Sequence, residues 1–80
     1  MSKAKKQPFA ICVNDSLKRY LKDLNGETPA ALYDMVISQV EKPLLEIVME
    51  CAENNQCRAA QMLGINRNTL RKKLRDHGII

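Results

Sequence analysis

Apolar residues recur at helical spacing in several stretches of this 80-residue chain, and each such stretch predicts a helix. The first predicted helix begins at a capping residue, Asp15 or Ser16, and ends at Asn25-Gly26, where glycine tolerates a left-handed backbone. The apolar segment 9–13 before it either packs on the body of the protein or adds a short extended piece. The apolar positions of the helix itself are Leu17, Tyr20, Leu21 and Leu24.

A longer helical stretch is predicted from Thr28-Pro29 to about Glu53, because a hydroxyl cap followed by proline is typical of a helix start. Pro43 removes one backbone hydrogen bond, so it either kinks a single helix or divides the stretch into two helices at Lys42. Apolar residues cover too much of the circumference to pack against a small monomer, which favours burial against a second copy. The predicted homodimer interface is Leu32, Val36, Val40, Leu44, Leu45, Ile47 and Val48.

The C-terminal stretch predicts two short helices joined by a tight turn. Asn55 can cap a helix from Gln56 to Leu63, and Asn66 can cap the helix that follows. Between them Gly64 supplies a turn conformation that a Cβ atom disfavours. The predicted fold is therefore all-α, with four helices in one domain and a helix-turn-helix at its end. Its predicted parts are an N-terminal arm with a disordered tip (1–14), dimerisation helices (15–53) and the helix-turn-helix region (54–80).

Packing positions within this corner determine which of its side chains face outward. The small Ala60 lets the two helix backbones approach closely, and Ile65 fills the angle between them. Leu70 and Leu74 are four residues apart on the last helix and are predicted to face the core. The outward side chains of that helix are then Asn68, Thr69, Lys72 and Arg75, with Arg71 and Lys73 on its flanks.

Charge is distributed unevenly along the chain. Residues 27–53 contain one base and six acids, whereas residues 54–80 contain six bases and one acid. A basic C-terminal end indicates a surface that binds a polyanion. These bases lie on two capped helices, which favours a DNA-binding surface over a charged face that is merely exposed to solvent. Arg67, in the first turn, is placed to donate to guanine O6 and N7 in the major groove. Phosphates are predicted to meet Asn66, Thr69, Arg71 and Lys73, and the backbone N–H groups of Asn55 or Gln56.

Composition argues against several other classes of protein. A domain of this size buries a modest core and commonly depends on a partner chain. The three cysteines have no metal-site spacing, and their odd number predicts reduced thiols in a cytoplasmic protein without metal or cofactor. No apolar run approaches the roughly 20 residues of a membrane span. No paired carboxylates, nucleophile–base pair or phosphate loop indicates an enzyme.

Two segments, 40–45 (VEKPLL) and 64–74 (GINRNTLRKKL), resemble the Fis (factor for inversion stimulation) family of bacterial nucleoid-associated proteins. The resemblance extends from about Leu17 to Gly78. It implies a homodimer intertwined through its first two helices, with a proline-kinked helix at its core and two helix-turn-helix units in adjacent major grooves. Because these units are closer together than one turn of straight DNA, binding bends the duplex and specificity is largely indirect. The implied base contacts are Asn66, Arg67 and Lys72; the implied phosphate contacts are Asn55, Cys57, Thr69, Arg71 and Lys73.

The chain also departs from the family pattern. The 14 residues before Asp15 are shorter than the arm that activates a DNA invertase, so contact with an invertase is not carried over. Cys57 replaces a threonine hydroxyl, and a thiol is a weaker donor to phosphate. Glu53 and Asp76 stand at basic positions, which argues against wrapping of flanking DNA. The prediction is a nucleoid-associated transcriptional regulator in the cytoplasm, with RNA polymerase as a further candidate partner. The alternative is a helical protein-interaction module with a solubilising basic end.

Overall fold

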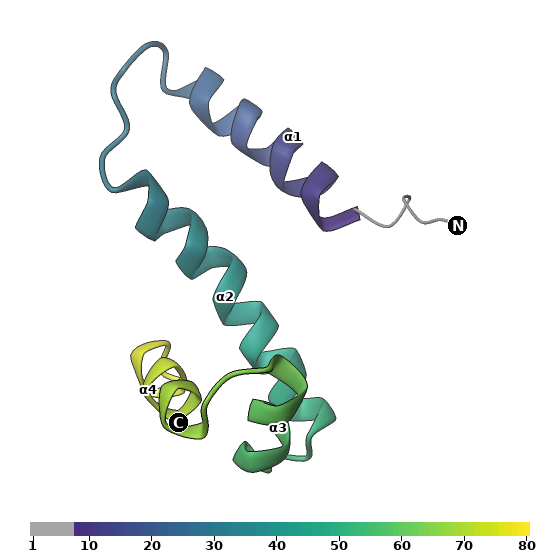
Figure 1. The fold of residues 1–80 in the computed structure, drawn as a ribbon. Helices are drawn as coiled ribbons and strands as arrows, with labels where there is room; N and C mark the ends of the chain where they lie inside the picture. The colour runs from purple at the N-terminus through teal and green to yellow at the C-terminus, as the bar shows by residue number, and fades with distance from the viewer. Residues whose placement is uncertain (1–7) are drawn as a thin grey trace. The chain divides into compact units, whose positions relative to one another are not determined.

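The computed structural model describes residues 8–80, which form four α-helices joined by turns and short loops (Figure 1). No strand occurs in that range, so the prediction of an all-α chain with four helices is confirmed. The described residues divide into two compact units, residues 8–32 and residues 33–80. The Lys-rich tip, predicted to be disordered, lies outside the described residues. Within them, no helix is both long enough and apolar enough to cross a membrane. The helices are α1 (Pro8–Asp23), α2 (Leu32–Cys51), α3 (Gln56–Leu63) and α4 (Arg67–Asp76).

Helix α1 is longer than the sequence pattern predicts. It begins at Pro8, well before the predicted start at Asp15 or Ser16, and ends at Asp23. Proline suits the first position of a helix, where its missing N–H has no partner to lose. The segment 9–13 is therefore helical, because its apolar residues continue the spacing of those that follow. The left-handed residues Asn25 and Gly26, with φ of 55° and 85°, end this region as predicted.

Helix α2 begins at Leu32 and not at Thr28-Pro29, because Ala31 has a left-handed backbone with φ of 51°. It continues through Pro43 as one helix, so a division at Lys42 does not occur. It ends at Cys51, before the predicted end, in a turn where Glu53 and Asn54 have φ of 55° and 64°.

The core of residues 33–80 lies where the last turns of α2 meet α3 and α4. Its fully covered side chains are apolar in every case, and the largest are leucines. Four half-buried residues, Val48, Leu63, Ile65 and Ile79, pack around it. The core thereby joins the end of α2 to both short helices. Its members are Leu45, Met49 and Ala52 from α2 and the adjoining turn, Ala59 and Ala60 from α3, and Leu70 and Leu74 from α4.

Candidate nucleic-acid interface

A glycine turn sets the angle between α3 and α4. Gly64 has φ of 73°, and its N–H donates to the carbonyl oxygens of Ala60 at 2.9 Å and Gln61 at 3.2 Å. The N–H of Ile65 also donates to Ala60, at 3.1 Å, which satisfies carbonyls left free at the end of α3. A Cβ at Gly64 would meet no atom within 4 Å. The turn therefore needs glycine for its backbone conformation and not for space.

Asparagine side chains cap both short helices, as the sequence predicts. The Oδ1 atom of Asn55 accepts a hydrogen bond from the N–H of Arg58 at 3.1 Å. The Oδ1 atom of Asn66 accepts one from the N–H of Asn68 at 2.7 Å. Each cap uses the amide oxygen, so each side chain keeps its NH₂ group as a donor at the N-terminal end of a helix. Both NH₂ groups can donate hydrogen bonds to an anion that binds at the helix N-terminus.

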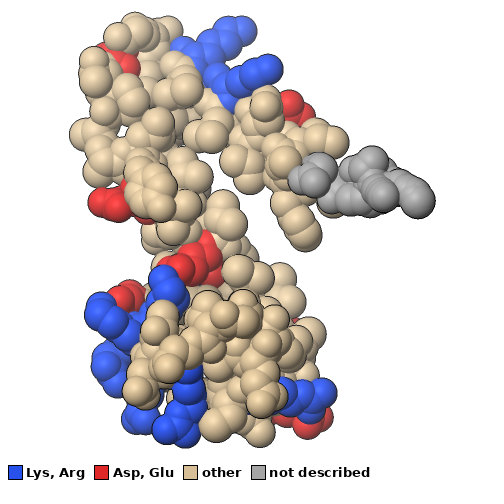
Figure 2. All heavy atoms as spheres, viewed as in Figure 1, with Lys and Arg blue, Asp and Glu red and all other residues tan. Residues whose placement is uncertain are grey.

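The inward face of α4 is fixed by Leu70 and Leu74, which are each fully buried. Ala59 and Ala60 are also buried, which confirms that the helices pack closely through small residues. Lys and Arg side chains consequently gather over α4 on its outward side (Figure 2). The predicted DNA-contacting residues at the start of α4 and along it are all exposed; they are Asn66, Arg67, Thr69, Arg71 and Lys72.

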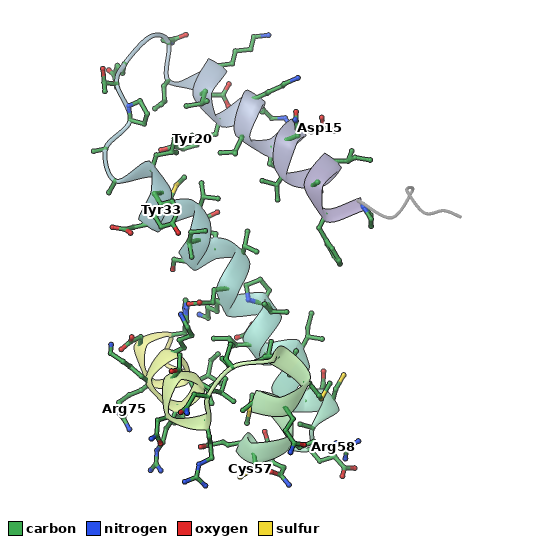
Figure 3. The ribbon with its side chains drawn as sticks, in the orientation of Figure 1. Asp15, Tyr20, Tyr33, Cys57, Arg58 and Arg75 are labelled. Carbon is green, nitrogen blue, oxygen red and sulfur yellow. The ribbon has the colours of Figure 1, made fainter. Side chains whose placement is uncertain are left out.

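A contact across the corner joins two of the predicted site residues. Arg67 Nη1 donates to the sulfur of Cys57 at 3.6 Å, and both side chains are exposed. Cys57 lies in the first turn of α3, beside the half-buried Gln56 (Figure 3). Sulfur is a weak acceptor, so a stronger acceptor can take the guanidinium from it. Arg58, the next residue, lies on the opposite side of this unit from Arg75 (Figure 3).

The outward lysine Lys72 has an acidic neighbour on α4. Its Nζ lies 3.1 Å from Asp76 Oδ2, and the two side chains are 75% and 57% exposed. An exposed pair of this kind contributes about 0.3–0.5 kcal/mol, so it hardly restrains Lys72. Asp76 reduces the positive charge of the outward face at the C-terminal end of α4.

Lys73, predicted to contact phosphate, is instead engaged by α2. Its Nζ lies 2.8 Å from Glu41 Oε2, and His77 Nε2 lies 2.8 Å from Glu41 Oε1. Hydrogen bonds from Lys73 and then from His77 hold the pKa of Glu41 below its ordinary value of 4.5, against the opposing effect of burial. The sequence does not predict this network, because Glu41 is more than 30 residues from both partners. The only local signal is that Lys73 and His77 lie one helical turn apart.

Helix α2 carries an exposed apolar stripe in addition to the face that enters the core. Its members are 42% to 75% exposed and follow one another at alternating steps of four and three residues. Val40, Leu44 and Ile47 belong to the predicted dimer interface, whereas Tyr33 and Ile37 extend the stripe and were not predicted. Leu45, also predicted to be interfacial, is buried in the core of its own chain. Leu32, Val36 and Val48 are half-buried. The apolar stripe is Tyr33, Ile37, Val40, Leu44 and Ile47.

Sequence comparison with known proteins places this chain in a family. The sequence profile described as "Bacterial regulatory protein, Fis family" matches residues 36–77. A relative named as a Fis-like DNA-binding protein, from Ralstonia nicotianae, is 57% identical over 75 residues, covering 94% of this chain and 97% of the relative. One of the same name from Neisseria meningitidis serogroup B is 58% identical over 69 residues, covering 86% of this chain and 87% of the relative. The DNA-binding protein Fis of Mannheimia haemolytica is 52% identical over 73 residues, covering 91% of this chain and 74% of the relative. The chain belongs to the Fis family of bacterial regulatory proteins.

Proposed function

We propose that this protein binds double-stranded DNA as a homodimer, placing the α4 helix of each subunit in the major groove. The observation that carries the proposal is the exposed basic face of α4, whose opposite face is fixed in the core by Leu70 and Leu74. A helix held by one face and basic on the other is suited to enter a groove lined by phosphates. The relatives' names, which describe DNA-binding proteins, support the same function.

Base contacts are proposed at the N-terminal end and centre of the outward face. Arg67 is exposed in the first turn and can donate two hydrogen bonds to one guanine. Lys72 is exposed and weakly restrained, and the NH₂ group of Asn66 lies at the start of the same helix. Phosphates are proposed to meet Asn55, Gln56, Cys57, Thr69 and Arg71. A phosphate contact by Lys73 requires its ammonium to leave Glu41.

The apolar stripe of α2 supports the homodimer. Alternating steps of four and three residues are the spacing of a seam between two packed helices. Leu44 and Ile47 remain 47% and 59% exposed in the single chain, although the neighbouring face of α2 is buried. Burial of the stripe against a second copy removes this apolar surface from water and sets two α4 helices at one fixed separation.

The bending of DNA is proposed from the family resemblance together with this fixed separation. If the two α4 helices stand closer than one turn of straight DNA, the duplex must bend for both to enter successive major grooves. The energy of that deformation depends on the sequence between the contacts, so much of the specificity arises from base pairs that no side chain touches. Such a protein acts in the bacterial nucleoid as a regulator of transcription.

A gel-shift titration of random-sequence duplex at several salt concentrations tests the function. We expect binding at low salt. The logarithm of the binding constant should fall linearly with the logarithm of the salt concentration, with a slope near −0.9 per phosphate contacted. Light scattering should give the mass of a dimer. A folded dimer that does not bind duplex even at low salt would instead support the protein-interaction module with a solubilising basic helix.

A further inference from the structure

We infer that Glu41 is a positioning residue for the DNA-binding helix: together with Lys73 and His77 it fixes the orientation of α4 against α2. The inference rests on the proposed function, in which two α4 helices must meet DNA at a set separation and angle. It assigns a role to the one network of polar side chains, within residues 8–80, that joins α2 to α4.

The residues of α2 that face the helix-turn-helix form one continuous stripe. Leu45 and Met49 are buried against α3 and α4, four positions apart. Glu41 precedes Leu45 by the same interval, so it lies one helical turn further along the same face. The stripe therefore changes from apolar to charged where it passes beyond the core. At that place a carboxylate, and not a methyl group, meets the C-terminal half of α4.

Both oxygens of the carboxylate are used: one binds Lys73 of α4, and the other binds His77, which caps the C-terminus of that helix. Lys73 Nζ lies 2.8 Å from one oxygen and His77 Nε2 lies 2.8 Å from the other. The side chains of His77, Glu41 and Lys73 are 10%, 23% and 38% exposed, so bulk water competes less for the contact to His77 than for the contact to Lys73. Two directional contacts at positions one turn apart restrain rotation of α4 as well as its translation. The apolar contacts of the core fix which face of α4 is buried, and the two polar contacts add directional restraints beyond the edge of the core.

Lys73 has a different part in this arrangement from the other bases of α4. Its ammonium is held at α2, whereas Arg71 and Lys72 remain exposed. If Lys73 acts by positioning α4, its loss and the loss of Glu41 have the same effect on DNA. If Lys73 is a phosphate contact that Glu41 merely competes for, the two losses have opposite effects. The sign of the change thus separates the two roles.

The first experiment measures the orientation without DNA. Residual dipolar couplings in solution give the angle between α2 and α4 in the 80-residue wild type, in Glu41→Ala and in Glu46→Ala. Glu46 is an exposed acid of the same helix, so its variant matches the loss of charge. We expect the angle to change in Glu41→Ala and to stay unchanged in Glu46→Ala. An unchanged angle in both variants overturns the inference, whether or not the protein binds DNA. If Glu41→Ala does not fold, Glu41→Gln, which keeps the shape of the side chain, and His77→Gln, which removes one contact, replace it.

The second experiment measures bending. Ligation of a fragment of about 150 base pairs, near the persistence length of DNA, gives closed circles faster when a bound protein bends it. At saturating protein we expect Glu41→Ala and Lys73→Met each to reduce circle formation about fivefold, and the double variant to reduce it no further. Tighter binding with unchanged circle formation in Glu41→Ala, and a weaker salt dependence in Lys73→Met, would overturn the inference. A wild type that binds without promoting circles contradicts the proposed bending, and the dipolar couplings still decide the role of Glu41.

Discussion

The guanidinium of Arg67 donates to the sulfur of Cys57 across the corner between α4 and α3, at 3.6 Å. The contact joins a proposed base-reading side chain to a proposed phosphate-facing one, and neither is buried. Because the sulfur is a weak acceptor, Arg67 is restrained in the free protein but can leave for a guanine.

Replacing Cys57 should change affinity without changing sequence preference. In Cys57→Thr the hydroxyl donates to phosphate more strongly than a thiol, so we expect tighter binding to all duplexes by about 0.5–1.5 kcal/mol. Fluorescence anisotropy with preferred and random duplexes measures both quantities. Cys57→Ala is the matched control, because it removes the sulfur without adding a donor. Equal affinities of the two variants would show that this position does not meet a phosphate.

Loss of Arg67 should relax specificity. We expect Arg67→Ala to lose about 1–3 kcal/mol of discrimination between a selected preferred duplex and a random one, because a contact to guanine is lost. Arg71→Ala should weaken binding to both duplexes alike and reduce the salt slope by about 0.9 for each subunit. Arg58→Ala, on the opposite side of this unit from Arg75, is the control and should leave discrimination unchanged. Identical losses in all three variants would argue against separate roles.

Replacing Gly64 should lower the stability of the protein because of its backbone conformation and not because of a steric contact. Gly64→Ala should lower the free energy of unfolding by about 1–2 kcal/mol, because an L-residue is strained at φ of 73°. Chemical denaturation followed by circular dichroism measures it. D-Alanine introduced at this position by synthesis adds the same methyl group in open space but favours positive φ. It should restore the stability, and a comparable loss with both enantiomers would indicate a steric cause.

Leu44 and Leu45 are neighbours in the sequence with different expected roles. Leu44 is 47% exposed and Leu45 only 2% exposed in the single chain. Leu44→Glu should give a folded monomer by sedimentation equilibrium, because the charge falls on the apolar stripe. Leu45→Ala should leave association intact and destabilise each chain by about 2–5 kcal/mol, as for other buried leucines. A dimeric Leu44→Glu variant would contradict the proposed interface.

Protonation of Glu41 at low pH should lower the free energy of unfolding. Its pKa is lowered in the folded chain, so its ionised form stabilises the fold, and this contribution is complete above its ordinary value of 4.5. The contribution is lost as the pH falls through the lowered value. When the pH falls from above 4.5 to below the lowered pKa, the free energy of unfolding of the wild type should therefore decrease by more than that of Glu41→Gln. Parallel pH curves for the two proteins would contradict the assignment of the shift to this carboxylate.

The sequence predicts both limits of α3 and the start of α4 to the residue, because these limits are set by local chemistry. Asn55 and Asn66 are caps, and Gly64 ends α3 through a conformation that other residues avoid. The predicted start of α2 at Thr28-Pro29 was wrong. A hydroxyl cap followed by proline is typical of a helix start, but Ala31 has a left-handed backbone, and an alanine gives no sign of that in the sequence.

Features that depend on distant contacts were predicted less well. The apolar residues of α2 were recognised, but the sequence alone did not show which of them face the helix-turn-helix. Leu45 was therefore grouped with Leu44, and the stripe was not extended to Tyr33. The link between Glu41 and Lys73 was missed because it depends on how α2 and α4 pack, which no local pattern specifies.

If the apolar stripe of α2 is the seam of the proposed dimer, its register sets the distance between the two α4 helices that would contact DNA. A helix rises about 1.5 Å per residue, so a slip of seven residues along the seam would displace one subunit by about 10 Å. That distance is roughly a third of the 34 Å turn of DNA, enough to set two reading helices out of phase with successive grooves. In the proposed dimer, unequal side chains along the stripe, from Tyr33 to Ile47, would oppose such a slip, because each would pack into a different hole of the partner. In such a dimer the spacing of the apolar residues of α2 would determine the distance between the two DNA-contacting helices.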